Sequence, residues 1–246
     1  MKKTLLPFLL VLATAASAQM FGDKGVSPAD QRYHAYRFET TQPPFALSKV
    51  KAIIKGIKPK KGGEDDMGDV KATAAWDRMS TAERFTYSML HGEDPSQNCD
   101  AMPWVTDEAH KVFAYPAGFF GNEVWSKRQL DFLHGHRSEV VRMLRETIRT
   151  RQRVGANLKD TITALTTNEL IPDLIAVYKR DRKDGDILTL LMLLMREGNY
   201  APFIASTTYK KLYGPDASYQ SFIVANEANQ KLMFERAMAF YRTRVH

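Results

Sequence analysis

Apolar residues recur at three- and four-residue steps along most of the chain after residue 80. The longest apolar run, Ile187 to Met195, is apolar on every side. A helix with no polar face cannot border water, so this run predicts a helix at the centre of the core. The preceding segment, 169–180, carries its apolar residues on one face, and Pro172 falls in its first turn, where proline is tolerated. We therefore predict two consecutive helices here.

Capping residues suggest where further helices begin and end. Ser80-Thr-Ala-Glu83 matches the capping box and predicts a helix start at Ser80. Ser138 is expected to cap a helix that runs to about Val154 and ends at Gly155. Further helical segments are expected over 107–114 and 122–133, and the longest helix is expected to start at Ser218. Alternating apolar and polar runs joined by hairpin turns are absent after Ser80, so no strands are predicted.

The two helices at 169–180 and 187–195 are joined by the turn Lys183-Asp-Gly-Asp186. This pair resembles one unit of a HEAT-like helical repeat, although no second copy follows at a fixed period. The resemblance implies helical hairpins stacked on one another. The predicted fold is therefore all-α, an irregular helical bundle or a stack of helical hairpins, forming one domain over residues 80–246.

Residues 19–79 have the composition of loops, with four prolines and the acidic run Glu64-Asp65-Asp66. They are predicted to form a loop-rich N-terminal arm. Within the arm, one helical face carries four apolar residues, Val50, Ile53, Ile54 and Ile57. Three basic residues lie off that face: Lys51, Lys55 and Lys58. This pattern predicts a short basic amphipathic helix, suited either to an interfacial membrane contact or to packing on the main domain.

The first eighteen residues have the three parts of a secretory signal peptide. Lys2 and Lys3 precede an apolar run from Leu5 to Ala13, and small residues follow up to Ala18. The run is well short of the ~20 residues that span a bilayer, so cleavage after Ala18 is expected rather than anchoring. We predict an exported protein of the bacterial periplasm or cell exterior, with no transmembrane segment in the mature chain.

Loss of Lys2 and Lys3 with the signal peptide lowers the formal net charge from +7 to +5. A mildly basic exported protein favours anionic surfaces as partners, such as lipid head groups or polyanionic polysaccharides, and nucleic acid is not expected outside the cytoplasm. A protein or another component of the cell envelope is the alternative partner. The remaining chain is long enough to bury a core without disulfides or metal, and no cofactor is predicted.

Cys99 is the only cysteine and lies in a polar stretch, residues 91–100, together with His91. A catalytic thiolate needs a neighbouring base, which His91 or His110 would supply if the fold brings either close. That arrangement would make the protein a cysteine-dependent hydrolase or transferase. The alternative is a buried structural cysteine, since no family signature surrounds it.

Two further clusters carry candidate chemistry. Asp131, His134 and His136 offer three metal ligands, but no H-E-x-x-H motif accompanies them. Histidines at a helix C-terminus also interact favourably with the helix dipole, and no metal site is predicted. The second cluster is an arginine stripe on one face of the helix after Ser138: Arg142, Arg145, Arg149 and Arg153.

Four guanidinium groups in a row can bind carboxylates, phosphates or sulfates. Alternatively, they pair with acids on a neighbouring element. Phosphate-binding glycine loops and nucleophile elbows are both missing from the sequence. Because helical packing explains most residues, the leading hypothesis is a non-enzymatic interaction or structural module. A Cys99-dependent enzyme and a binder of anionic surfaces are the alternatives.

Overall fold

The structure is a computed structural model that describes residues 25–57, 74–96, 102–121 and 123–244. The signal peptide, Lys58, the acidic run and Cys99 lie outside these ranges. The described residues are mostly helical, which confirms the predicted all-α class. None of the helices in these ranges is both long enough and apolar enough to cross a membrane.

The α-helices are α1 (Pro28–Phe38), α2 (Leu47–Lys55), α3 (Ala74–Arg78), α4 (Thr81–Leu90), α5 (Lys127–Gly135), α6 (Arg137–Arg151), α7 (Ala156–Ala164), α8 (Ile171–Asp181), α9 (Gly185–Glu197), α10 (Ala201–Ile204), α11 (Thr207–Tyr213) and α12 (Glu227–Arg242). Three 3-10 helices are η1 (Glu108–His110), η2 (Ala117–Phe120) and η3 (Asn168–Leu170). The strands are β1 (Asp94–Pro95), β2 (Lys111–Phe113), β3 (Glu123–Val124) and β4 (Phe222–Val224).

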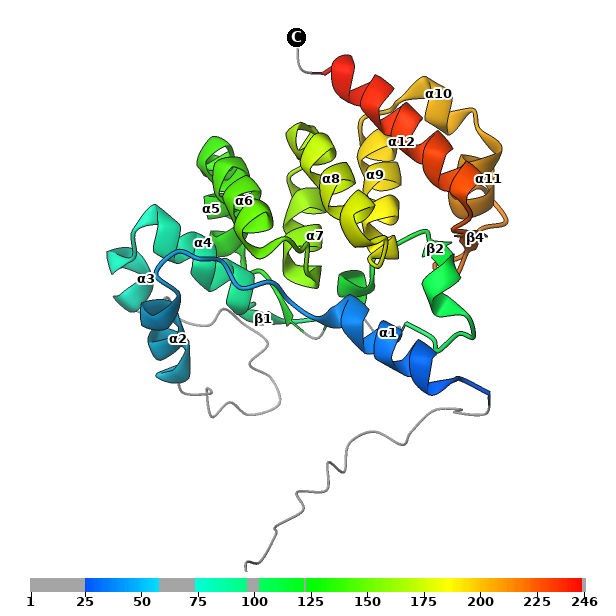
Figure 1. The fold of residues 1–246 in the computed structure, drawn as a ribbon. Coiled ribbons are helices and arrows are strands. Elements are labelled where there is room, and N and C mark those ends of the chain that lie inside the picture. The colour runs from blue at the N-terminus through cyan, green and yellow to red at the C-terminus, as the bar shows by residue number, and fades with distance from the viewer. Residues whose placement is uncertain (1–24, 58–73, 97–101, 122, 245–246) are drawn as a thin grey trace, which may run out of the picture.

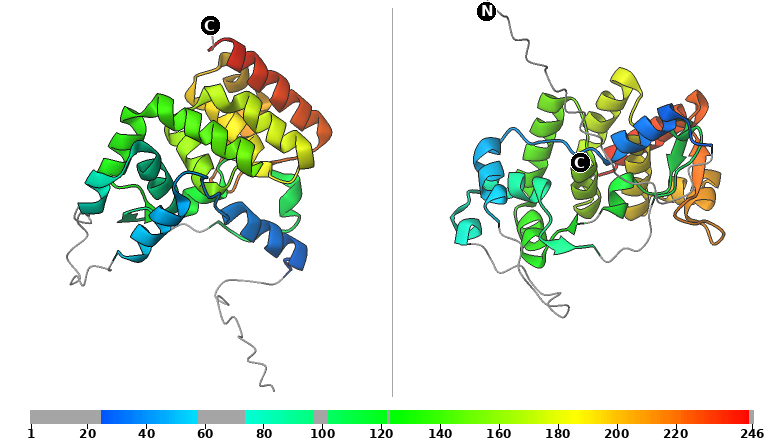
Figure 2. Two further views of the ribbon diagram at one scale, coloured as in Figure 1. Left: turned by 60° about the vertical axis from the view of Figure 1, so that its left-hand side comes forward. Right: turned by 90° about the horizontal axis from the view of Figure 1, so that it is seen from below.

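The longer helices stand side by side in a row above the N-terminal segment. In Figure 1, α5 and α6, then α8 and α9, then α12 follow one another from left to right, and residues 28–57 run underneath them. The view from below in Figure 2 shows the same segment crossing the ends of these helices. One hydrophobic core joins the row to this segment, because Val50 of α2 belongs to the same buried cluster as Phe240 of α12.

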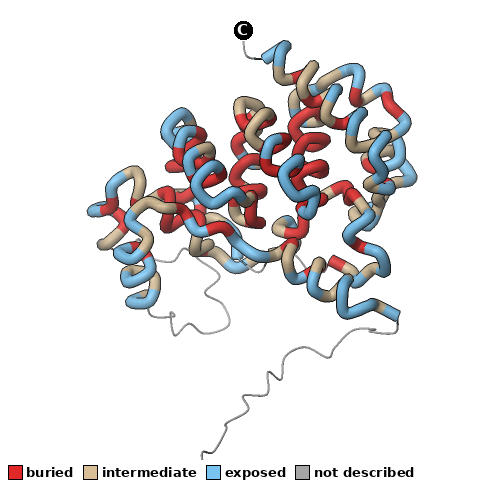
Figure 3. Tube along the Cα trace, in the orientation of Figure 1, coloured by how far each residue is buried: buried red, intermediate tan, exposed pale blue. Residues whose placement is uncertain are grey.

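Helix α9 is the centre of that core. Every residue from Ile187 to Met195 is buried, as predicted from the uninterrupted apolar run. Figure 3 shows the buried residues concentrated where α9 meets its neighbours and the exposed ones on the outer faces of the row. Helix α8 packs on one side of α9 and α12 on another. Pro172 lies in the first turn of α8, as expected for a proline that lacks an N–H donor.

The prediction that strands are absent is wrong. Strands β1 and β3 pair antiparallel, and β2 pairs with β4 in the register Val112 to Ile223. Each strand has only two or three residues, too few to show an alternating pattern in the sequence. The predicted helix over 107–114 is instead the 3-10 turn η1 followed by β2. The helix predicted from Ser218 begins at Glu227, because β4 occupies residues 222–224 and Asn226 provides the cap.

A second boundary also differs from the prediction. Helix α6 starts at Arg137, so Ser138 is inside the helix and does not cap it. The segment predicted as a loop-rich arm with one short basic helix contains three helices: α2 lies where the basic helix was predicted, and α1 and α3 were not predicted. Helix α1 has the N-terminal residues that favour a start: Ser27 accepts a hydrogen bond from the Asp30 N–H, and Pro28 occupies the first turn. Arg37 of this helix is almost completely buried.

The capping box of α4 is present as predicted. The Ser80 hydroxyl accepts a hydrogen bond from the Glu83 N–H at 3.3 Å, and the Glu83 carboxylate accepts one from the Ser80 N–H at 2.9 Å. Replacing Ser80 with alanine should lower the free energy of unfolding by about 1 kcal/mol, because one helix N–H loses its acceptor. Urea denaturation measures the difference. Thr81→Ala, one residue into the helix, is the control, and equal stabilities of the two variants would contradict the prediction.

Candidate functional site

A pocket of about 750 Å³ opens between α4, α7, the end of α9 and the segment 115–125. Its walls are mainly apolar and aromatic, with Tyr115, Phe119 and Trp125 contributing rings and Leu90 and Leu193 contributing aliphatic side chains. The rings of Tyr115 and Phe119 are stacked with centroids 5.2 Å apart. A cavity of this size and composition is typical of small-molecule sites.

Helix α7 provides one continuous wall. Five of its residues, spaced by one, three or four positions, line the pocket: Ala156, Asn157, Asp160, Thr163 and Ala164. This spacing follows one helical face, and the other face carries the buried residues Leu158, Lys159 and Ile162. The helix therefore separates the pocket from the core behind it.

Most polar groups on the walls already have partners. The Asn157 amide donates to the carbonyls of Thr41 and Met89 at 2.9 and 2.7 Å, which ties α7 to α4 and to the N-terminal segment. Arg196 donates to the Tyr115 hydroxyl at 3.2 Å and lies 3.7 Å from the Glu197 carboxylate. These hydrogen bonds and this ion pair hold the walls of the pocket together.

Asp160 is an exception, as is the buried Ser88 hydroxyl, which has no hydrogen-bond partner among the described residues. No hydrogen bond or ion pair joins the Asp160 side chain to another described residue, although this residue is only partly exposed and lines the pocket. Burial raises the pKa of Asp160 to about 7, and the nearby Lys159 only partly offsets that effect. An unpaired carboxylate that is half ionised at neutral pH can accept a hydrogen bond, exchange a proton or pair with a cation.

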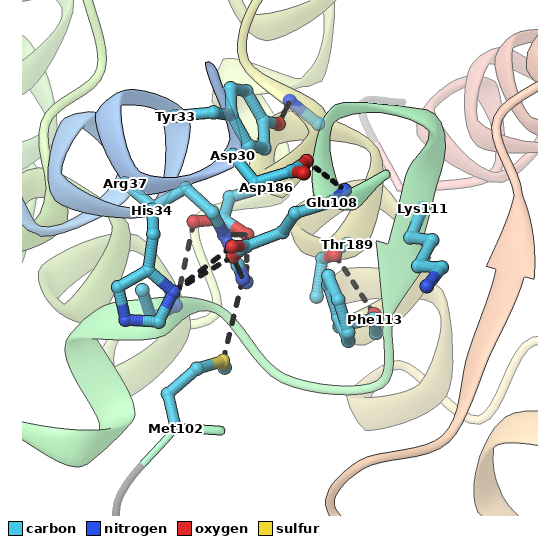
Figure 4. A network of polar contacts seen from close by, with 12 residues as sticks. Asp30, Tyr33, His34, Arg37, Met102, Glu108, Lys111, Phe113, Asp186 and Thr189 are labelled. Atoms are coloured by element: carbon cyan, nitrogen blue, oxygen red, sulfur yellow. Dashed lines mark hydrogen bonds and ion pairs between the residues drawn. The ribbon is translucent and has the colours of Figure 1, made fainter. Parts of the chain in front are cut away.

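Behind α7 lies a buried network of charges that fixes α1 against the rest of the molecule (Figure 4). Arg37 lies at the centre of the network, with its guanidinium nitrogens 2.7 Å from Asp186 Oδ1 and 2.5 Å from Glu108 Oε1. His34 approaches the same Glu108 carboxylate at 3.0 Å. Lys159 Nζ completes the network at 2.7 Å from Asp184 and 3.3 Å from Asp186.

The charges in this network depend on one another because they are almost completely excluded from water. Burial alone would raise the pKa of Asp186, but Lys159 and Arg37 outweigh it and hold that pKa below its usual value. Asp186 also accepts a weak hydrogen bond from the Ala117 N–H at 3.4 Å. Since Ala117 begins η2, the network helps to position one wall of the pocket.

The candidate thiol site is only partly described. Cys99 lies outside the described residues, so its use as a nucleophile stays a prediction. His91 lines the pocket, with its Nδ1 3.4 Å from Glu123 Oε2. His110 lies elsewhere, exposed at the end of η1 and 2.5 Å from Asp107. The two proposed bases therefore do not belong to one site, and only His91 faces the pocket.

The arginine stripe pairs with acids. Arg145 and Arg149 both contact Asp173 of α8, at 3.0 and 2.9 Å. Arg153 reaches Glu39 at 2.6 Å, and Arg142 lies 3.7 Å from Glu146 on its own helix. These acids come from α6, α8 and the residue after α1. Anion binding by the stripe would require these contacts to be exchanged and stays a prediction.

Two members of the cluster Asp131, His134 and His136 have structural contacts. Asp131 pairs with Lys127 at 2.6 Å, and His136 Nδ1 lies 3.1 Å from the carbonyl oxygen of Phe132. Within the described ranges, no group of three or more histidine, cysteine or acidic side chains is arranged to hold a metal ion.

Comparisons with known proteins add no identity to this site. No protein-family model matches the chain, and no curated protein or solved structure gives a significant match. The functional argument therefore depends on the geometry of the pocket.

Sequence reasoning did not single out Asp160 or Arg37. One sequence feature bears on Asp160: Lys159 and Asp160 are adjacent in a short amphipathic helix, so they must point in directions about 100° apart. Two adjacent charges on this helix can therefore lie in different surroundings. Two residues of α1 enter the network, His34 and Arg37, and they lie on one helical face. A polar face of a helix is usually solvated, so nothing in the sequence indicated that Arg37 lies in the interior.

Proposed function

We propose that this chain is an exported binding protein that holds a small, largely apolar molecule in the pocket between α4, α7 and α9. This develops the hypothesis of a non-enzymatic interaction module by giving it a site. The observation that carries the proposal is the cavity of about 750 Å³ with aromatic and aliphatic walls. Pockets of roughly 300–1,000 Å³ enclose most of the surface of a small organic ligand.

The composition of the wall supports binding rather than simple imperfect packing. Phe119 and Val124, at the pocket, expose 57% and 46% of their surfaces, and exposed apolar groups are costly unless something covers them. Several polar wall groups hold the frame through contacts that bridge distant segments, such as Trp125 Nε1 to the Ser88 carbonyl at 2.7 Å. A frame of this kind preorganises a site and reduces the entropy lost on binding.

Helix packing around the pocket also bears on the finer fold prediction. We infer that α8 and α9, which pack against each other, form a hairpin of the HEAT-like kind that the sequence resembles. A Cys99-dependent enzyme and an anionic-surface binder remain the alternative functions.

The proposal predicts saturable binding of a neutral apolar fluorophore by the mature chain, residues 19–246. Diphenylhexatriene, which fluoresces in apolar surroundings, is a suitable probe, and titration should reach one equivalent. Ala164→Trp should weaken its binding at least about tenfold, because an indole placed on the pocket face of α7 would occupy the cavity. Fluorescence titration gives both constants.

The matched control is Ala52→Trp, which adds the same side chain at an exposed position of α2 away from the pocket. It should bind the probe as the unmodified chain does. Circular dichroism checks that both variants keep their helices. A titration without saturation, or equal affinities of the two tryptophan variants, would refute the proposed function.

A further inference from the structure

The carboxylate of Asp160, which has no partner among the described residues, indicates the chemical class of the ligand, whereas the size of the pocket does not. Its two oxygens face the backbone of η2: a Cβ added to Gly118 would lie 2.5 and 2.7 Å from them. Only glycine, which has no Cβ, leaves room for the two oxygens of Asp160 at this position. No described residue donates a hydrogen bond to them. Unpaired buried carboxylates are costly, and they persist where function uses them.

The charges nearest to Asp160 cannot neutralise it. Its neighbour Lys159 is committed to Asp184 and Asp186 on the opposite side of α7. Arg37 is committed to Asp186 and Glu108. The buried network therefore contains three carboxylates, those of Glu108, Asp184 and Asp186, and two permanent cations, so Asp160 adds a further carboxylate to an already acidic region.

The remaining charged groups of the pocket are paired with one another. His91 lies beside Glu123, and Arg196 lies beside Glu197. Among the described residues that line the pocket, no positive side chain is directed to Asp160. A ligand with a negative end would be repelled here, whereas a ligand with a positive end would supply the missing partner.

The aromatic rings of the pocket favour the same kind of ligand. Tyr115, Phe119 and Trp125 share the pocket with Asp160. Aromatic faces attract cations within about 6 Å through their quadrupoles, and they also pack against hydrocarbon. Arg196 already makes such a contact, with its guanidinium carbon 5.9 Å from the centre of the Tyr115 ring.

We propose that the pocket selects amphiphilic amines: the protonated nitrogen pairs with the carboxylate of Asp160, and the hydrocarbon part lies against Tyr115, Phe119 and Trp125. This inference rests on the proposed function, because it names the class of ligand for the same cavity. It also explains why the chain keeps a carboxylate that has no partner among the described residues.

Binding of an amine should depend on pH in a defined direction. The pKa of Asp160 is about 7 in the free protein, and an amine binds the ionised form. Affinity should therefore fall about tenfold per pH unit below 7 and level off above it. The other titratable groups around the site are His91, Glu123 and Glu197 on the walls and Lys159, Asp184 and Asp186 behind α7.

The test is displacement of diphenylhexatriene by three ligands with the same hydrocarbon chain: decylamine, decanol and decanoate. At pH 8 decylamine should displace the probe at least about tenfold more effectively than decanol, and decanoate should be the weakest. In Asp160→Asn the advantage of decylamine over decanol should disappear, together with its dependence on pH. His91→Gln should retain that dependence.

Asp131→Asn is the matched control, since it makes the same chemical change on α5, away from the pocket, and should keep the preference for the amine. Equal displacement by decylamine and decanol in the unmodified chain would overturn the inference, while saturable binding of the neutral probe would still support the proposed function. An amine preference that persists in Asp160→Asn would also overturn it, because another group would then recognise the nitrogen.

Discussion

Replacing Arg37 with alanine is expected to lower the free energy of unfolding by about 3–5 kcal/mol. The substitution leaves the carboxylates of Glu108 and Asp186 buried without their shared cation. Removing one partner of a buried ion pair is more costly than removing the whole pair, because the remaining charges have no water around them. Equilibrium denaturation in urea at pH 7 measures the change.

Arg32→Ala is the control, because Arg32 lies on the same helix but is exposed. Its effect should stay within about 0.5 kcal/mol. The penalty at Arg37 should also depend on pH. The pKa of Asp186 is held below its usual value in the folded protein, so the stability that this pair provides is present at neutral pH and is lost as the pH falls through that lowered pKa. A penalty equal to that of Arg32→Ala would show that α1 is not held by the network.

Replacing Phe240 with alanine should cost about 3–5 kcal/mol, the usual range when a buried phenylalanine is truncated. Phe240 is completely buried on α12, and its ring lies against the backbone of Gly198 and 5.3 Å from the ring of Tyr200. A Cβ on Gly198 would come within 2.7 Å of the Phe240 Cε2 atom. Gly198 is therefore required for space, and its φ of −78° is available to any residue.

This contact can be tested by a double-mutant cycle. Gly198→Ala alone should destabilise by about 1–3 kcal/mol, because the methyl group overlaps the ring. In the Phe240→Ala background the same substitution should cost much less, since the space is then empty. Leu232→Ala, at a position of α12 that is 38% exposed, serves as the control for truncation on this helix. Additive effects at positions 198 and 240 would contradict the packing described.

The parts of the fold that could be predicted are those fixed by local sequence. The run 187–195 has no polar residue other than Thr189, so any helix it forms must be buried, and it is. Thr189 is accommodated because its hydroxyl donates to the Phe113 carbonyl at 2.9 Å. The capping box at Ser80 was equally local, since both of its hydrogen bonds join residues three positions apart.

The parts that could not be predicted depend on distant residues. Strand β4 exists because β2 pairs with it, and the two are more than a hundred positions apart. Residues 222–224 therefore form a strand, although the spacing of their apolar residues suggested a helix. Arg37 was not singled out for the same reason. Nothing near it in the sequence shows that Glu108 and Asp186 surround it.

The residues of the candidate site were also predictable only where the local sequence shows their chemistry. His91 was identified because histidine has evident chemistry, and it does line the pocket. Asp160 was not identified, because an aspartate on an amphipathic helix is normally solvated. Asp160 matters because no described residue pairs with it, and a sequence does not show whether two distant segments make a contact.

The position of Arg37 also constrains the order in which the chain can fold. Its partner Asp186 lies 149 positions later in the sequence, so α1 cannot be fixed until α9 has been synthesised and has formed. Contacts over such separations close late and slowly, because the entropy of the intervening loop must be lost first. A newly made chain would therefore keep α1 undocked until α9 exists. Such a delay would suit the export that we propose for this chain, because a polypeptide passes through a translocation channel unfolded.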